Sequence, residues 1–179
     1  MEGSKTMGTQ QIIVLIINIL GGAAVMLSYV YGLRGQAGGA NVLWGGTPQG
    51  IRPVYTVSMV LSALSYFAFI FYILFRANPA DSNVSYSLYF AIFIVILGAS
   101  AFWMPLTNMY VNNGGTGLWI AIRGVLALVG LGSIALFITL LSVHSNAHGT
   151  AWWLAVVGAG YFALHTAILD AIVWAALFK

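Results

Sequence analysis

Asp170 is the one acidic residue that falls inside a long apolar stretch, where a carboxylate is costly and needs a partner. Arg123 is the natural candidate, because it lies five residues into the fourth apolar stretch and Asp170 lies eight residues before the end of the fifth. If the two stretches are antiparallel helices, both side chains lie about 8–12 Å below the same surface. The spacing allows a charge-assisted pair that polarises a binding site. The alternative is that Arg123 extends to the lipid headgroups and a protonated Asp170 bonds a neighbouring helix.

Two patterns of spacing mark the last apolar stretch. Polar and aromatic residues recur at every fourth position and predict one face of a helix, at Phe162, Thr166, Asp170 and Trp174. Beside them runs a ladder of small residues, Ala155, Ala159, Ala163, Ala167, Ala171 and Ala175. Small side chains at this interval let helix backbones approach closely, which predicts packing against a neighbouring helix or in a homodimer.

The histidines do not predict a metal site. His144 and His148 have the spacing of metal ligands, but they lie in a connection rich in Ser, Asn and Gly without a third or fourth ligand. His165 lies deeper, and we expect it to bond a neighbouring helix. A proton relay between His165 and Asp170 is disfavoured, because five residues of an ideal α-helix rotate two side chains about 140° apart.

Catalytic motifs do not appear in the sequence. It contains no G-x-S-x-G, no Walker motif and no H-E-x-x-H. With zero cysteines it has no disulfide framework, no thiol nucleophile and no cysteine-ligated metal. The net charge is +3, but the six Lys and Arg residues are scattered singly, so we predict no nucleic-acid surface. An enzyme is the least favoured class.

Five apolar stretches must position these residues: 12–32, 54–75, 88–106, 118–142 and 152–178. Each is close to the length of about 20 residues that crosses a bilayer. Charged residues make up 5% of the chain, compared with about 25% in a soluble domain. Because lipid offers no partners for backbone polar groups, each stretch should be a helix. The sequence predicts an all-α integral membrane protein, a single five-helix bundle over 1–179, in a bacterial inner or organellar membrane.

The connection 33–53 is the only one long enough to act as a lid. Trp44 among glycines and prolines favours a structured lid, and the alternative is a solvated connector with Trp44 at the headgroups. Five crossings place the termini on opposite sides of the membrane. Lys5 and Arg76 then share the N-terminal side, and the other basic residues share the C-terminal side: Arg34, Arg52, Arg123 and Lys179. The positive-inside rule predicts a cytoplasmic C-terminus.

Four short motifs occur along the chain, from the long connection to the last apolar stretch. They are Trp44 and Pro48 in the long connection, Pro53-Val54-Tyr55-Thr56, Phe102-Trp103-Met104-Pro105-Leu106, and Leu169-Asp170-Ala171-Ile172-Val173-Trp174. The last three are similar to the P-V-W-T, L-W-S/T-P-L and L-N-x-x-V-W patterns of the TspO/MBR family, the tryptophan-rich sensory proteins, which have five spans and a long first loop. The chain has Tyr55, Ser100 and Asp170 where that family has Trp, Asn and Asn. The resemblance implies a porphyrin, a haem-type ligand or a sterol-like lipid.

The sequence therefore predicts a receptor or transport-type membrane protein that binds a hydrophobic planar small molecule among its five helices. The expected ligand-binding residues combine aromatic rings with a few polar groups: Trp44, Tyr55, Trp103, Asn108, Arg123, Asp170 and Trp174. The alternative is an auxiliary subunit of a larger photosynthetic or respiratory membrane complex, without a ligand site. The scarcity of soluble loops and the alanine ladder favour that alternative.

Overall fold

The computed structural model describes residues 7–34, 36, 38–78, 83–143 and 149–178. Its long helices are α1 (Thr9–Arg34), α2 (Arg52–Phe75), α3 (Tyr86–Asn113), α4 (Thr116–Leu141) and a last helix over Thr150–Leu177. All five are apolar and long enough to cross a membrane. No strand occurs in the described ranges. The all-helical architecture with five membrane-length helices is confirmed.

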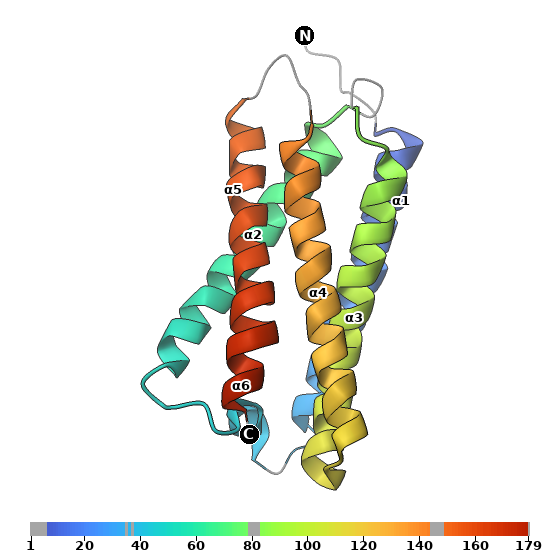
Figure 1. Cartoon of the computed structure of the whole chain (residues 1–179). Helices are drawn as coiled ribbons and strands as arrows, with labels where there is room; N and C mark the ends of the chain where they lie inside the picture. The colour runs from blue at the N-terminus through green and yellow to red at the C-terminus, as the bar shows by residue number, and fades with distance from the viewer. Residues whose placement is uncertain (1–6, 35, 37, 79–82, 144–148, 179) are drawn as a thin grey trace.

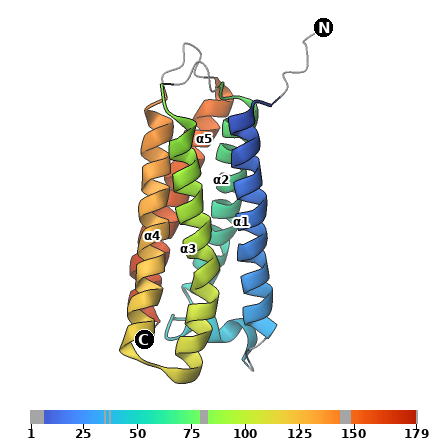
Figure 2. The ribbon, with the colours of Figure 1, turned by 90° about the vertical axis from the view of Figure 1, so that its right-hand side faces the viewer.

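The helices form an elongated bundle with the two termini at opposite ends (Figure 1). Helix α3 packs between α1 and α4, and α5 (Thr150–Leu164) packs between α2 and α4. Helices α1 and α2 contact each other only sparingly, so α1 rests mainly on α3 (Figure 2). Helix α2 is tilted: it packs closely on α5 and diverges from the final segment of the chain near the C-terminal end (Figure 1).

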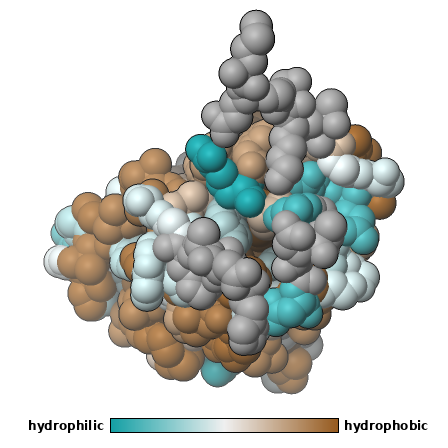
Figure 3. All heavy atoms as spheres, turned by 90° about the horizontal axis from the view of Figure 1, so that it is seen from above, coloured by the Kyte–Doolittle hydropathy of each residue, from teal (hydrophilic) through white to brown (hydrophobic). Residues whose placement is uncertain are grey.

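The outer surface is apolar along the helices. Helix α1 buries only Gln11, Val14 and Gly32, and its exposed side chains include Ile16, Ile19 and Leu27. Viewed from the N-terminal end of the bundle, hydrophobic atoms dominate the flanks of the molecule and hydrophilic atoms collect on the end face (Figure 3). This distribution is the one that contact with a lipid bilayer requires.

The last helix changes its pitch midway. Residues His165–Trp174 form a π-helix, η2, which is followed by a short α-helical turn, α6 (Ala175–Leu177). A π-helix bonds residue i to residue i+5, and long π segments are rare and are frequent at functional sites. Side chains five residues apart therefore approach each other in η2, which changes the face on which each residue lies.

Helix α3 is longer at its C-terminal end than the sequence predicts. It passes Pro105, continues beyond Leu106 to Asn113, and is joined to α4 by Gly114 and Gly115 alone. Both glycines have positive φ, 66° and 107°, a conformation that side-chain-bearing residues rarely adopt. The polar residues after Leu106 suggested a loop, but they lie on the last turns of α3, so Asn108 is a helical residue.

The alanine ladder packs inside the chain. Ala155, Ala159, Ala163 and Ala175 are buried, and Gly130 of α4 lies so close to Ala167 that a Cβ there would stand 2.9 Å from its Cα. Of the two predicted uses of the ladder, packing against neighbouring helices is the one observed. Packing of the ladder in a homodimer stays a prediction.

Buried side chains form two apolar clusters at the two ends of the bundle. The upper cluster, toward the N-terminal end in Figure 1, is centred on Val14, Phe69, Ile73, Tyr86, Tyr89, Phe93, Ile96, Leu136, Leu140 and Trp152. The lower cluster, toward the C-terminal end, consists of Tyr55, Trp119, Ile122, Leu126, Trp174, Ala175 and Phe178. The polar residues of η2 lie next to the lower cluster.

Candidate functional site

The π-helix brings His165 and Asp170 together. His165 Nε2 lies 3.6 Å from Asp170 Oδ2, and this is the ion pair found within the described ranges. The prediction that the two side chains point about 140° apart is wrong for this segment, because it assumed ideal α-helical rotation. A distance of 3.6 Å exceeds that of a hydrogen bond, so the contact is electrostatic.

The other nitrogen of His165 is held by α2. Ser58 Oγ lies 2.9 Å from His165 Nδ1 and 2.9 Å from the hydroxyl of Tyr161 on α5. His165 and Ser58 are both buried. These contacts fix the imidazole ring, and therefore fix the nitrogen that faces Asp170. The arrangement is a polar chain from Tyr161 through Ser58 and His165 to Asp170.

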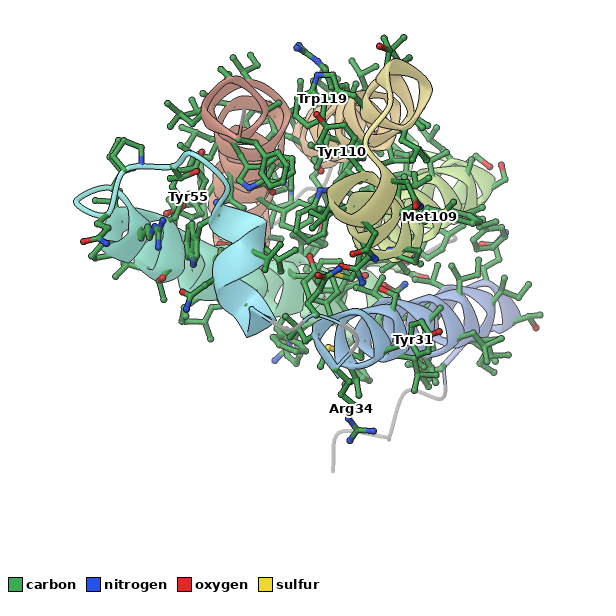
Figure 4. All side chains as sticks on the ribbon, turned by 90° about the horizontal axis from the view of Figure 1, so that it is seen from below. Tyr31, Arg34, Tyr55, Met109, Tyr110 and Trp119 are labelled. Atoms are coloured by element: carbon green, nitrogen blue, oxygen red, sulfur yellow. The ribbon has the colours of Figure 1, made fainter. Side chains whose placement is uncertain are left out.

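Asp170 lies where α1, α2 and η2 meet. Tyr29 of α1 and Tyr55 of α2 are both close enough to interact electrostatically with its carboxyl group. The Tyr55 hydroxyl donates to the Leu169 carbonyl at 2.7 Å, which ties the start of α2 to η2. Figure 4, a view from the C-terminal end, shows Tyr55 between α2 and the last helix. The Asp170 side chain keeps 34% of its surface accessible although it lies among three helices.

Arg123 does not pair with Asp170. It is exposed on α4, and Asp170 has His165 as its ionic neighbour. The prediction relied on matching depth in the membrane, and depth alone does not fix the direction in which a side chain points. The structure therefore does not bring Arg123 to the site.

Aromatic rings line the neighbourhood of Asp170. The Trp103 ring lies 5.6 Å from Tyr29 and 5.4 Å from Trp174, centroid to centroid. Trp174 donates its indole N–H to the Leu43 carbonyl at 3.0 Å. The indole N–H of Trp103 is buried and has no hydrogen-bond partner within the described residues. An orphan donor in such a place calls for a water molecule or a ligand.

The connection between α1 and α2 folds onto the C-terminal end of the chain. Its short helix η1 (Gly39–Trp44) is followed by Gly46, whose N–H donates to the Phe178 carbonyl at 3.1 Å. The Trp44 ring meets Tyr55 edge-on at 6.1 Å. The Arg52 guanidinium lies 5.6 Å from the Trp44 ring centroid. Of the two alternatives for this connection, the described residues fit a structured segment.

Asn108 joins α1 to α3. Its Nδ2 donates to the Gly32 carbonyl at 3.1 Å, and its Oδ1 accepts from Gln36 Nε2 at 3.1 Å. Both polar atoms of the amide are therefore engaged in holding the lower end of α1. Among the predicted site residues, the structure gathers Trp44, Tyr55, Trp103, Asp170 and Trp174, while Asn108 acts as a link between helices.

Three residues of the site were not selected from the sequence: Tyr29, Ser58 and Tyr161. Ser58 and Tyr29 belong to none of the motifs of the sequence. Ser58 and Ser62 lie four residues apart and are both buried, a face of α2 that could have indicated a polar contact. His144 and His148 lie outside the described residues.

Comparison with known proteins finds no match: no family model, no curated protein and no solved structure is similar to this chain.

Proposed function

We propose that this protein is a membrane receptor or transport-type protein that binds a hydrophobic small molecule beside Asp170, among α1, α2, α3 and η2. The observation that carries the proposal is the partly accessible Asp170 side chain, at 34%, with Tyr29 and Tyr55 nearby. Ligand sites are typically apolar and aromatic with a few polar groups that fix orientation. The unpartnered N–H of Trp103 is a further group that a ligand would satisfy.

A binding site fits better than a continuous pore. Above the polar chain, the bundle is filled by Phe69, Phe93 and Ile96, which are essentially inaccessible. A proton or an ion leaving His165 toward the N-terminal end meets this upper cluster. Transport would therefore require the helices to rearrange, whereas binding requires only the arrangement described.

A planar ligand suits the aromatic rings at this site. Trp103 and Trp174 pack at 68° to each other, and Tyr29 lies on the other side of Trp103. Rings set at such angles can contact both the face and the edge of a planar molecule. The resemblance to the TspO/MBR family adds tetrapyrroles and sterol-like lipids as the ligand classes to be tested first.

Titration with protoporphyrin tests this proposal. Binding near Trp103 and Trp174 should quench tryptophan emission of the purified protein, and Trp103→Phe should weaken the apparent affinity about tenfold. Trp153→Phe is the matched control, because Trp153 is exposed at the other end of the bundle. Equal affinities for the two variants would contradict the proposed site, and unchanged emission of the wild-type protein would contradict the tetrapyrrole class.

We also propose that the C-terminal end of the bundle, with its η1 segment, faces the cytoplasm. Arg34, Arg52 and Arg123 share this end, whereas Arg76 lies at the other end. Because the protein contains zero cysteines, one introduced cysteine reports its own location. A cysteine at Asn113 should resist a membrane-impermeant maleimide added to intact cells. Rapid labelling from outside would reverse the orientation.

The second candidate function is an auxiliary subunit of a larger membrane complex. The observation that favours it is α1, which rests mainly on α3 and leaves most of its apolar side chains exposed. Extraction in a mild detergent distinguishes the two functions. Co-purification with other subunits in fixed stoichiometry supports the subunit, and an isolated protein that binds its ligand supports the receptor.

A further inference from the structure

Asp170 has no Lys or Arg partner within the described chain, and its one ionisable contact is His165, which carries a charge only when protonated. It is the only acidic residue of the described ranges, and no hydrogen bond described for these residues involves it. His165 Nε2 at 3.6 Å is too far to donate a hydrogen bond to the carboxylate. Ionisable side chains within membrane segments usually pair with each other or mark the path of a substrate. The missing partner is therefore the feature to explain.

The basic residues are engaged or placed elsewhere. Arg34, Arg76 and Arg123 are exposed, and Arg76 lies at the opposite end of the bundle beside Phe71. Arg52 donates its Nε–H to the Thr47 carbonyl at 3.1 Å and lies against the Trp44 ring. None of these described arginines therefore pairs with the Asp170 carboxyl.

The side chains around Asp170 are suited to a positive charge on an organic molecule. Tyr29 and Tyr55 lie within electrostatic range of the carboxyl group, the Tyr55 hydroxyl bonds the carbonyl of the adjacent Leu169, and the Trp103 ring lies 5.6 Å from that of Tyr29. Aromatic faces attract cations, and cages of aromatic rings are a known means of recognising ammonium groups. A carboxylate beside such rings adds charge complementarity that a neutral ligand does not use.

We propose that the ligand held beside Asp170 is a hydrophobic organic cation, whose positively charged nitrogen lies between the Asp170 carboxylate and the rings of Tyr29, Tyr55 and Trp103. This inference rests on the proposed function and specifies the chemistry of its ligand. A metal ion fits less well, because hard cations take six or more oxygen ligands and no group of three metal-binding side chains occurs among the described residues.

A pair of probes with the same shape and different charge tests the inference. The permanent cation 10-methylacridinium and the neutral 9-methylanthracene share a three-ring skeleton and differ in the nitrogen. Binding to the purified wild-type protein is measured by equilibrium dialysis, with the same detergent on both sides of the membrane. We expect the cation to bind at least tenfold more tightly, and Asp170→Asn to remove that preference.

Asp170→Glu is the second variant, because it keeps the negative charge and should retain most of the preference for the cation. Thermal unfolding of Asp170→Asn in detergent, compared with that of the wild-type protein, shows that the variant is folded. Equal binding of the two probes by the wild-type protein, or an unchanged preference in Asp170→Asn, overturns the charge inference and leaves the ligand site intact. If the wild-type protein binds neither probe, both the inference and the proposed binding site fail.

Discussion

The two ends of the bundle differ in how completely their polar groups are satisfied. In the upper half, the Tyr86 hydroxyl donates to the Ile73 carbonyl at 3.0 Å, and the Trp152 indole donates to the Leu140 carbonyl at 3.1 Å. In the lower half, the Trp103 indole N–H and the Thr47 hydroxyl are buried without partners among the described residues. Asp170 has no hydrogen-bond donor there.

This difference separates two roles. A cluster in which every buried donor is paired and the large rings are fully enclosed stabilises the fold. The lower region has orphan donors, a partly accessible carboxyl and a π-helix, and each of these features makes it less stable. Such features are typical of sites that bind ligands. Substitutions in the upper half should therefore change stability, and substitutions in the lower half should change binding.

Phe93→Ala should have the largest effect, on stability. The Phe93 ring is fully buried and stacks on Phe69 at 6.3 Å, so its removal leaves a void in the upper cluster. We expect a loss of about 3–5 kcal/mol in unfolding free energy, measured by thermal or denaturant unfolding in detergent. Phe102→Ala, on the same helix but 64% exposed, is the control and should change stability little. Similar losses for the two variants would contradict the role of the upper cluster.

Gly45→Ala should have an intermediate effect, on the connection between α1 and α2. Gly45 has φ of 48°, and a Cβ there would collide with the carbonyl oxygen of Phe178. Backbone strain of this kind costs about 1–3 kcal/mol, which should detach η1 from the end of the last helix. Faster proteolysis of the connection and faster ligand release would report the change. Gly50→Ala is the control, because nothing lies near its Cβ position; equal effects in both would count against a docked connection.

Ser58→Ala should have the smallest effect on stability and a local effect on the imidazole. It removes the partner of His165 Nδ1 and of the Tyr161 hydroxyl, and interhelical hydrogen bonds in membranes contribute about 0.6–1.7 kcal/mol. The ¹⁵N NMR signals of His165 should shift. Thr56→Ala, on the exposed face of the same helix, should leave them unchanged. An unshifted spectrum in Ser58→Ala would show that Ser58 does not orient the ring.

The five helices could be predicted from the sequence because apolar length decides whether a segment crosses a bilayer. The aromatic residues of the site, Trp103 and Trp174, could also be selected, since large rings in short motifs are visible in one chain. The partner of Asp170 could not. Its position depends on the π-helix, and no local composition distinguishes His165–Trp174 from an α-helix. The wider turn of the π-helix gives Asp170 a contact with His165 in place of the predicted pair with Arg123.

The most direct test of this account asks which residues of the last helix lie on the same face. Because the native chain has zero cysteines, pairs of cysteines can be introduced cleanly at His165 and Asp170, and at His165 and Ile168. Cadmium should protect the first pair from maleimide labelling, because a π-helix brings residues five apart together, and should leave the second pair reactive, because residues three apart share a face only in an α-helix. Protection of the 165–168 pair alone would mean an α-helix, and would remove Asp170 from the site.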